Sequence, residues 1–247
     1  MSDDGPTKNT SIPLTSSSPS TMPSTMPSPE IITQGDGWIA LNKPSGASIH
    51  SEDGITGYIA NAELQLKQKL WPVHRLDKVT SGILLVATSA EAAAHLSAQF
   101  AERTVCKYYL AVSARKPIKK QGWIKGDMEK ARNGCWKLAR TLTNPAITRF
   151  VSHFDESTNT RFYLLKPSTG KTHQLRVAMK SISAPIHGDT RYGGTEADRA
   201  YLHAYYLSFE MSGQRIELSC LPSSADTAES SWPVLPDAWL TPLDVIS

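Results

Sequence analysis

The greatest density of reactive side chains lies in residues 73–82, which read Val-His-Arg-Leu-Asp-Lys-Val-Thr-Ser-Gly. An acid, Asp77, stands among basic and hydroxyl side chains just before the apolar run at residues 83–87. A continuous apolar run predicts a buried strand, and the end of a strand is a rigid support for a catalytic group. A carboxylate there can act as a nucleophile or as a general base. A polar loop with Ser81 and Gly82 as its turn is the alternative interpretation.

A second polar segment, residues 168–176, begins a stretch whose apolar spacing predicts a helix over residues 170–182. His173, Arg176 and Lys180 recur on the side opposite the apolar residues and form a basic stripe. Positive charge at the N-terminus of a helix favours the binding of phosphate. A solvated cationic face produces the same pattern.

A third feature is the basic segment at residues 115–140, which holds nine Lys or Arg and two acids, a net charge of +7. The whole chain carries only +3, so positive charge is concentrated here. Trp123 and Trp136 are interleaved with these charges. Localised positive charge with aromatic rings suits an RNA backbone and unstacked bases. An exposed lysine-rich hairpin with its tryptophans in the core is the competing interpretation.

The remaining composition describes an ordinary globular chain with a polar tail. Residues 1–30 are rich in Ser, Thr and Pro and predict a disordered tail, while residues 31–247 form one domain of normal size. The three cysteines form no CxxC pair, which argues against a disulfide framework and a zinc site. The sequence contains neither a membrane-length apolar run nor a secretory signal, so we expect a cytoplasmic protein.

Periodicity predicts the elements that must position these residues. The expected strands cover residues 38–42, 82–87, 107–112, 147–154, 161–165 and 215–218, and a helix capped by Ser89 follows the second of them. Several strands follow one another without a helix between them. This order favours a mixed, largely antiparallel α+β domain over a doubly wound fold.

The polar segments, taken in order, resemble the RluA-type pseudouridine synthases over residues 38–210. The motifs that carry the resemblance are Lys43-Pro44-Ser45-Gly46 with His50; His74-Arg75-Leu76-Asp77 with Thr80-Ser81-Gly82; Phe100, Arg103, Lys107, Tyr109 and Ala111; Gly170 to Arg176; Pro185, Gly188-Asp189 and Tyr192-Gly193; and Leu202-His203-Ala204. The chain departs from the pattern at Val79, where an acid is common, at His187, where an apolar residue is common, and at residues 113–115, which replace a glycine. No S4-type RNA-binding domain is recognisable before Trp38.

The resemblance implies a pseudouridine synthase fold, a curved mixed antiparallel sheet flanked by helices with a central cleft. Residues 31–247 are then a catalytic domain that isomerises uridine to pseudouridine in structured RNA, ribosomal or transfer. It implies that Asp77 is catalytic, that Arg176 pairs with it, that Tyr109 stacks on the target base and that Leu202 lines the pocket. It also implies that no metal or organic cofactor is required, and we expect a monomer.

The expected site has two outer parts. The substrate pocket comprises His74, Arg75, Leu76, Thr80 and Leu202. The RNA-binding residues are Lys43, Lys116, Lys119, Lys120, Lys125, Lys171, His173 and Gln174. The basic segment at residues 115–140 is the candidate for substrate choice.

The implied reaction breaks a C–N glycosidic bond, turns the detached uracil and forms a C–C bond. Asp77 can assist as a nucleophile at C1′ or as a base at the C2′ proton, and its local sequence does not choose between them. Burial raises the pKa of such a carboxyl, and the fixed cation of Arg176 opposes that shift. Two other hypotheses are an RNA-binding or RNA-folding protein on the same fold, and a metal-dependent hydrolase that uses His74, Asp77 and His173, whose spacing is poor for a metal.

Overall fold

A large mixed sheet, seen in the computed structural model, organises the chain. The structure describes Met1 and residues 28–246, apart from 53, 223–231 and 233–234. The strands follow the order β1-β2-β4-β11-β5-β10-β9-β6, with β12 beside β11 and β3 beside β4. Their bounds are β1 Glu30–Gly35, β2 Trp38–Lys43, β3 Trp71–Pro72, β4 Ser81–Ala87, β5 Cys106–Ser113, β6 Gln121–Gly126, β9 Ala146–Asp155, β10 Thr160–Pro167, β11 Leu202–Met211 and β12 Gln214–Ser219.

The smaller elements surround this sheet. The hairpin β7 (Met128–Lys130) and β8 (Trp136–Leu138) forms a separate two-stranded sheet. The helices are α1 Tyr58–Leu66, α2 Ala90–Glu102, α3 Gln174–Ser181 and α4 Pro242–Val245, with short 3₁₀ turns η1 Arg132–Gly134, η2 Thr190–Tyr192 and η4 Asp237–Leu240. Among the described strands, β4 and β11 pair in parallel and the other pairings are antiparallel. The predicted mixed α+β fold is therefore confirmed.

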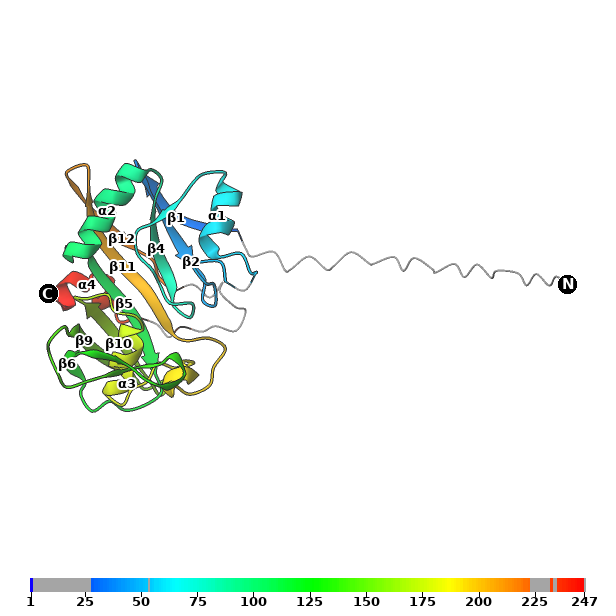
Figure 1. The fold of residues 1–247 in the computed structure, drawn as a ribbon. Helices are drawn as coiled ribbons and strands as arrows, with labels where there is room; N and C mark the ends of the chain where they lie inside the picture. Colours follow the sequence, from blue (N-terminus) through cyan, green and yellow to red (C-terminus); the bar gives the residue numbers. More distant parts are fainter. Residues whose placement is uncertain (2–27, 53, 223–231, 233–234, 247) are drawn as a thin grey trace.

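Helices α1 and α2 cover opposite faces of β4 in one half of the molecule (Figure 1). Leu84 and Val86 pack with α1, whereas Ile83 and Leu85 pack with α2. Because every residue of β4 is buried, the strand is held on both faces. Its N-terminal end is therefore a firm support for the polar segment that precedes it.

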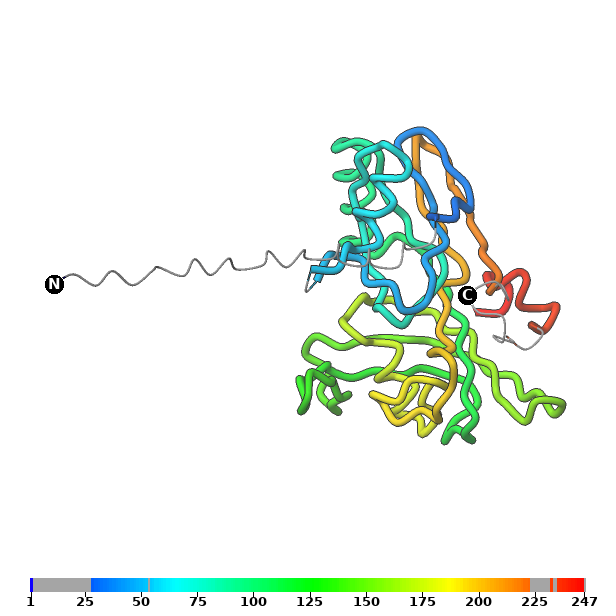
Figure 2. Tube along the Cα trace, turned by 90° about the vertical axis from the view of Figure 1, so that its right-hand side faces the viewer, coloured from blue at the N-terminus to red at the C-terminus, as the bar shows by residue number. Residues whose placement is uncertain are grey.

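The other half of the molecule, built on β5, β10, β9 and β6, repeats this arrangement (Figure 2). Tyr163 and Leu165 of β10 pack beneath α3, and Phe162 and Leu164 pack against the C-terminal residues Trp239 and Ile246. Strands β11 and β5 pair with each other in the middle of the sheet, and this pairing joins the two halves.

The predicted strands at residues 38–42, 82–87, 107–112, 147–154, 161–165 and 215–218 are confirmed as β2, β4, β5, β9, β10 and β12. Ser89 caps α2 as predicted, because its side chain accepts a hydrogen bond from the amide of Ala92 at 3.1 Å. The predicted helix at residues 170–182 is shorter, since α3 begins only at Gln174. The elements that were not predicted are strands β1, β3, β6, β7, β8 and β11 and helices α1 and α4.

The predicted disordered tail at residues 1–30 lies almost entirely outside the described residues, although Glu30 already belongs to β1. No helix in the described part of the chain has both the length and the apolar character needed to cross a bilayer.

Candidate active site

The polar loop of residues 73–80 connects β3 to β4 and carries Asp77 at its centre. A hydrogen bond from the Thr80 amide to the Asp77 carbonyl, 3.0 Å, closes the loop. Ser45 and Gly46 of the turn after β2 hold it from outside, through the carbonyls of Val79 and Lys78 at 2.9 and 2.8 Å. The Asp77 side chain is 18% exposed, so the carboxylate is largely sheltered yet accessible.

Asp77 lines a cavity of about 370 Å³ together with Tyr109 from β5 and Leu202 from β11. The other expected residues that line it are His74, Arg75, Leu76, Thr80, Lys171, His173 and Gln174. Arg103 and Lys107 add two further cations to the wall. The topology thus brings together segments that lie far apart in the sequence, around a volume typical of a small-ligand site.

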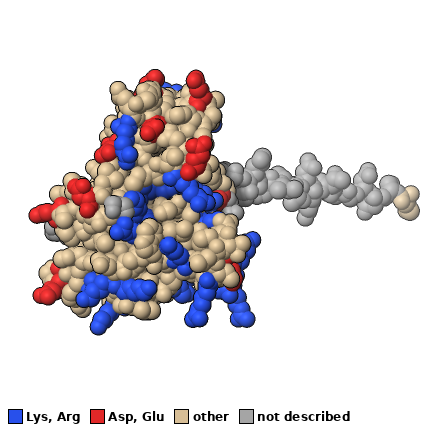
Figure 3. All heavy atoms as spheres, turned by 90° about the vertical axis from the view of Figure 1, so that its left-hand side faces the viewer, with Lys and Arg blue, Asp and Glu red and all other residues tan. Residues whose placement is uncertain are grey.

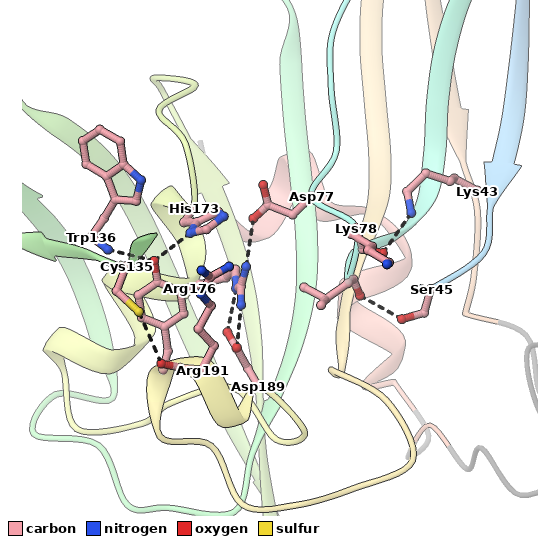
Figure 4. A network of polar contacts seen from close by, with 12 residues as sticks. Lys43, Ser45, Asp77, Lys78, Cys135, Trp136, His173, Arg176, Asp189 and Arg191 are labelled. Atoms are coloured by element: carbon pink, nitrogen blue, oxygen red, sulfur yellow. Dashed lines mark hydrogen bonds and ion pairs between the residues drawn. The ribbon is translucent and has the colours of Figure 1, made fainter. Parts of the chain in front are cut away.

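Arg176 is 4% exposed and stands between two carboxylates (Figure 4). Its Nε and Nη2 atoms donate to the two carboxylate oxygens of Asp189, both at 2.7 Å. Its Nη1 atom lies 3.7 Å from Oδ2 of Asp77. The pairing of Arg176 with Asp77, expected from the sequence, is thus a longer contact, while the two-point hydrogen bond to Asp189 fixes the guanidinium.

Tyr192 packs against Arg176, the cation that lies between Asp77 and Asp189. The Arg176 guanidinium carbon lies 4.7 Å from the centre of the Tyr192 ring. The Tyr192 hydroxyl accepts a hydrogen bond from the amide of Trp136 at 3.0 Å and lies 2.7 Å from Nδ1 of His173. One buried tyrosine therefore positions Arg176 and His173 and connects both to the β7–β8 hairpin.

The Tyr109 side chain lies beside Asp77 and points to the same face of β5 as Lys107, because the two residues are two apart on a strand. Burial and the negative charge of Asp77 raise the pKa of Tyr109. Burial lowers the pKa of Lys107. The cavity thus places a neutral aromatic ring next to a carboxylate, and Lys107, whose pKa is lowered, lies nearby.

His74 is fixed inside the loop. Its ring stacks on Phe100 with centroids 4.6 Å apart, and its Nε2 accepts a hydrogen bond from the Leu85 amide at 2.9 Å. Burial and the charge of Lys107 lower the pKa of His74 to about 3. The imidazole is therefore neutral at physiological pH, and Nε2 is already occupied by the backbone of β4.

Two expected RNA-binding residues lie in the interior instead. Lys43 is fully buried, and its Nζ donates to the carbonyls of Pro44 and Ala47 at 2.8 and 2.9 Å and to that of Lys78 at 3.3 Å. Gln174 is 5% exposed, and its amide bonds to residues 147, 148, 169 and 171. The full burial of Lys43 contradicts its expected contact with RNA, because its ammonium holds the turn after β2. Gln174 holds the start of α3 and also lines the cavity, so its contact with RNA stays a prediction.

The expected basic stripe on α3 is also corrected. His173 precedes the helix with a φ of 55°. Arg176 is buried and hydrogen-bonded to Asp189, so Lys180 is the one exposed residue of these three. The stripe therefore does not form a solvated face, because its central cation belongs to the ion group of the site. Lys171 lies outside the helix and bonds to Asn144 at 2.8 Å.

The other expected RNA-binding residues lie on the surface. Lys116, Lys119 and Lys120 are exposed in the loop between β5 and β6, and Lys125 is exposed on β6. The ammonium of Lys125 lies 5.0 Å from the centre of the Trp123 ring, which is 47% exposed. Figure 3 shows that Lys and Arg surround a hollow in the middle of one face and continue below it. Trp123 is exposed, and Trp136 is half-buried and belongs to none of the four core clusters of the described residues. The interpretation that places these tryptophans in the core is therefore wrong, and their contact with RNA stays a prediction.

No group of three or more His, Cys, Asp or Glu suited to a metal ion occurs within the described residues. The three cysteines are free thiols.

The roles of Asp189 and Tyr192 were not predicted from the sequence. Both stood in the family pattern, but only as motif positions. A buried arginine on an apolar helix requires a carboxylate partner, and that requirement was the available signal for Asp189. A second cavity of about 320 Å³, lined by Asp77, Arg176 and Asp189 among others, lies next to the first. Asp77 therefore stands at the boundary between two hollows.

Residues 37–181 match the sequence model of a family described as RNA pseudouridylate synthase. An "Uncharacterized RNA pseudouridine synthase" of Haemophilus influenzae is 53% identical over 199 residues, which cover 78% of this chain and 88% of that one. "Ribosomal large subunit pseudouridine synthase C" of Rickettsia bellii is 35% identical over 207 residues, covering 78% and 68%.

Two further likenesses extend the comparison. "tRNA pseudouridine synthase C" of Haemophilus ducreyi is 33% identical over 223 residues, covering 78% of this chain and 90% of that one. The solved structure of human RNA Pseudouridylate Synthase Domain Containing 1 superposes with a TM-score of 0.72 at 23% identity, covering 92% and 98% of the two chains. At that identity the superposition shows a shared fold.

Proposed function

From the premise that this chain belongs to the RNA pseudouridylate synthase family, of the RluA type, we propose that Asp77 is its catalytic aspartate and that ribosomal or transfer RNA is its substrate. The chain is a pseudouridine synthase, an isomerase. The observation that carries the assignment of Asp77 is its place in the cavity, with its carboxylate 3.7 Å from a buried arginine that another acid holds.

The proposed mechanism uses the chain's own side chains throughout. A uridine leaves its stack and enters the cavity. The Asp77 carboxylate then attacks C1′ or removes the C2′ proton, and the bond from C1′ to N1 breaks. The detached uracil turns, and its C5 bonds to C1′. On the first route the bond from Asp77 to C1′ breaks as this bond forms, and on the second route Asp77 returns the proton to C2′. The C5 proton leaves and N1 gains a proton, so no atom enters or leaves overall.

The surrounding residues hold the reacting groups. The Tyr109 ring offers a flat surface against which the loose uracil turns, and Leu202 closes the apolar side of the pocket. Arg176 stabilises the ionised Asp77 across the 3.7 Å contact. His74 and Thr80 shape the cavity wall, while Arg75, Lys171 and His173 face the RNA strand.

The exposed lysines at residues 116, 119, 120 and 125 are proposed to bind the RNA backbone. Relatives of this chain are named for ribosomal and for transfer RNA, so both classes stay in the proposal. Transcriptome-wide pseudouridine mapping with and without the gene tests it. We expect defined sites to disappear from one of the two RNA classes, and an unchanged map would contradict the proposal.

The role of Asp77 is tested by Asp77→Asn, with Asp36→Asn at an exposed turn as the matched control. We expect Asp77→Asn to abolish pseudouridine formation, to keep RNA affinity within about twofold and to remain folded. Asp36→Asn should behave as wild type. Retained modification in Asp77→Asn would overturn the assignment. Full activity in excess chelator, on an RNA that folds without Mg²⁺, would exclude the metal-dependent hydrolase.

A further inference from the structure

A third cavity, which is lined by cations, lies apart from Asp77, at the end of the sheet half built on β5, β9 and β10. It has a volume of about 380 Å³. The residues that line it are Ser113, Ala114, Arg115, Lys116, Lys120, Phe154, Asn159 and Arg161. Four of these eight are cations and none is acidic. Nothing in the proposed chemistry at Asp77 uses this cavity.

Strand register places the cavity on the same face of the sheet as Tyr109. Arg161 pairs with Ser113 on one side and with Phe154 on the other, so these three side chains point to one face. Ser113 and Tyr109 are four residues apart on β5 and share that face. At about 3.4 Å per residue the two positions lie roughly 13 Å apart. Ala111, between them, packs in the cluster beneath α3.

The cavity combines an open aromatic ring with fixed and mobile cations. Phe154 is 42% exposed, and the Arg161 guanidinium carbon lies 5.2 Å from the centre of its ring. Arg161 Nη1 also donates to Ser152 Oγ at 3.2 Å, and Ser152 Oγ donates to the Lys120 carbonyl. The guanidinium is thereby held, whereas Arg115, Lys116 and Lys120 extend into solvent.

The nearest acid along the chain is already engaged. Asp155 accepts hydrogen bonds from Ser157 and Thr158 through its two carboxylate oxygens, at 2.7 and 2.9 Å. These hydrogen bonds stabilise the turn between β9 and β10 and lower the pKa of Asp155. No ion pair among the described residues joins a carboxylate to Arg115, Lys116 or Lys120, so these cations can meet a ligand.

We propose that this cavity binds a second nucleotide of the RNA substrate, with its base against Phe154 and its phosphate at Lys116 and Lys120. The inference rests on the proposed RNA substrate and deepens it. An aromatic ring with neighbouring cations provides a stacking surface and a backbone contact for single-stranded RNA. Because the cavity lies about 13 Å from Tyr109 along β5, it holds a nucleotide other than the target uridine.

The test measures binding of a fluorescein-labelled dodecauridylate to the full chain by anisotropy, at several salt concentrations. Lys116→Ala/Lys120→Ala should weaken binding about tenfold at 0.1 M salt. It should also reduce the slope of log K against log salt by about 1.4, since each single-strand phosphate contact contributes about 0.7. The control is Lys69→Ala, an exposed lysine near α1 in the other half of the molecule, which should change neither quantity.

Phe154→Leu separates stacking from charge. It should weaken binding about tenfold, as expected for the loss of one base–aromatic stack, and leave the salt slope unchanged. Phe154→Trp should restore the affinity, which distinguishes stacking from a folding defect. A dodecamer containing 4-thiouridine should crosslink to residues 154–161.

Wild-type affinity in both sets of variants, or equal weakness of Phe154→Leu and Phe154→Trp, would overturn the inference. Tighter binding of polyglutamate than of RNA, lost in the same variants, would assign the cavity to an acidic protein partner instead. The single-turnover rate at saturating RNA should stay unchanged in the control Lys69→Ala. Failure of the Asp77 proposal appears separately, as modification retained by Asp77→Asn.

Discussion

Arg176 and Asp189 form a buried two-point ion pair, with both hydrogen bonds 2.7 Å long. The pair satisfies the guanidinium independently of Asp77, whose carboxylate stays 3.7 Å away. The proposed catalytic aspartate is thus stabilised by a cation without being tightly bonded to it. A carboxylate that must react needs such freedom, because a strong hydrogen bond would lower its nucleophilicity.

Asp189→Asn tests whether this pair positions Arg176. Removal of one partner of a buried ion pair costs about 3 kcal/mol of folding stability or more. We expect turnover to fall at least tenfold while KM for RNA changes less than twofold, because Asp189 holds Arg176 and is not proposed to bind RNA. Urea denaturation and single-turnover kinetics measure the two effects. A rise in KM at unchanged turnover would instead place Asp189 in RNA binding.

Tyr192 is expected to act through both ends of its side chain. Tyr192→Phe removes the hydroxyl contacts to His173 and Trp136 but keeps the ring beneath Arg176. We expect a loss of about 1 kcal/mol in stability and a modest loss of turnover. Tyr192→Leu removes the ring as well and should lower turnover much further. Equal activities of the two variants, measured at saturating RNA, would show that the ring does not support Arg176.

His74 makes stability depend on pH. Its pKa in the folded chain is about 3, below the ordinary value of about 6.5 in the unfolded chain. Between these values the unfolded state binds the extra proton, so the His74 contribution is fully present above about pH 6.5. It falls by about 1.4 kcal/mol per pH unit as the pH drops toward 3.

His74→Gln removes that titration and keeps a group able to accept the Leu85 amide. The difference in unfolding free energy between wild type and variant should therefore shrink with acidification between about pH 6 and 4. Urea denaturation at a series of pH values measures it. Parallel curves for the two proteins would mean that His74 is not held neutral by the fold.

Lys43→Met distinguishes an internal role of Lys43 from RNA contact. The substitution leaves the carbonyls of Pro44, Ala47 and Lys78 without their ammonium donor. We expect stability to fall by about 1–3 kcal/mol and turnover to fall because the loop carrying Asp77 loosens. The salt slope of RNA binding should stay unchanged, whereas Lys120→Met, at an exposed lysine, should reduce it. A reduced slope in Lys43→Met would restore the expected RNA contact.

Much of the fold was predictable because its strands have distinctive apolar patterns. The continuous run at residues 83–87 marked β4, and Ser89 marked the start of α2. Helix α1 was missed because it is short, with nine residues, and its N-cap, Gly57, offers no side-chain hydrogen bond. Strand β1 was missed because five of its six residues are exposed, so burial leaves little pattern in the sequence.

The sequence predicted which residues form the site better than it predicted the hydrogen bonds and ion pairs between them. Asp77, Tyr109 and Arg176 were named from the family pattern, and the structure places all three around the same pair of cavities. The buried roles of Lys43 and Gln174 were not predictable, because a basic or amide side chain near a motif usually faces solvent. The bond between Arg176 and Asp189 depends on how two segments meet in space, which local spacing does not encode.

The position of β11 between β4 and β5 has a consequence for synthesis on the ribosome. Asp77, Tyr109 and Arg176 all emerge within the first 176 residues, yet the strand that seats β4 beside the rest of the sheet begins only at Leu202. A nascent chain that stops short of β11 holds every proposed reactive side chain and no frame to bring them together. We therefore expect isomerisation to require that translation has passed β11, and a product truncated before Leu202 to form no pseudouridine.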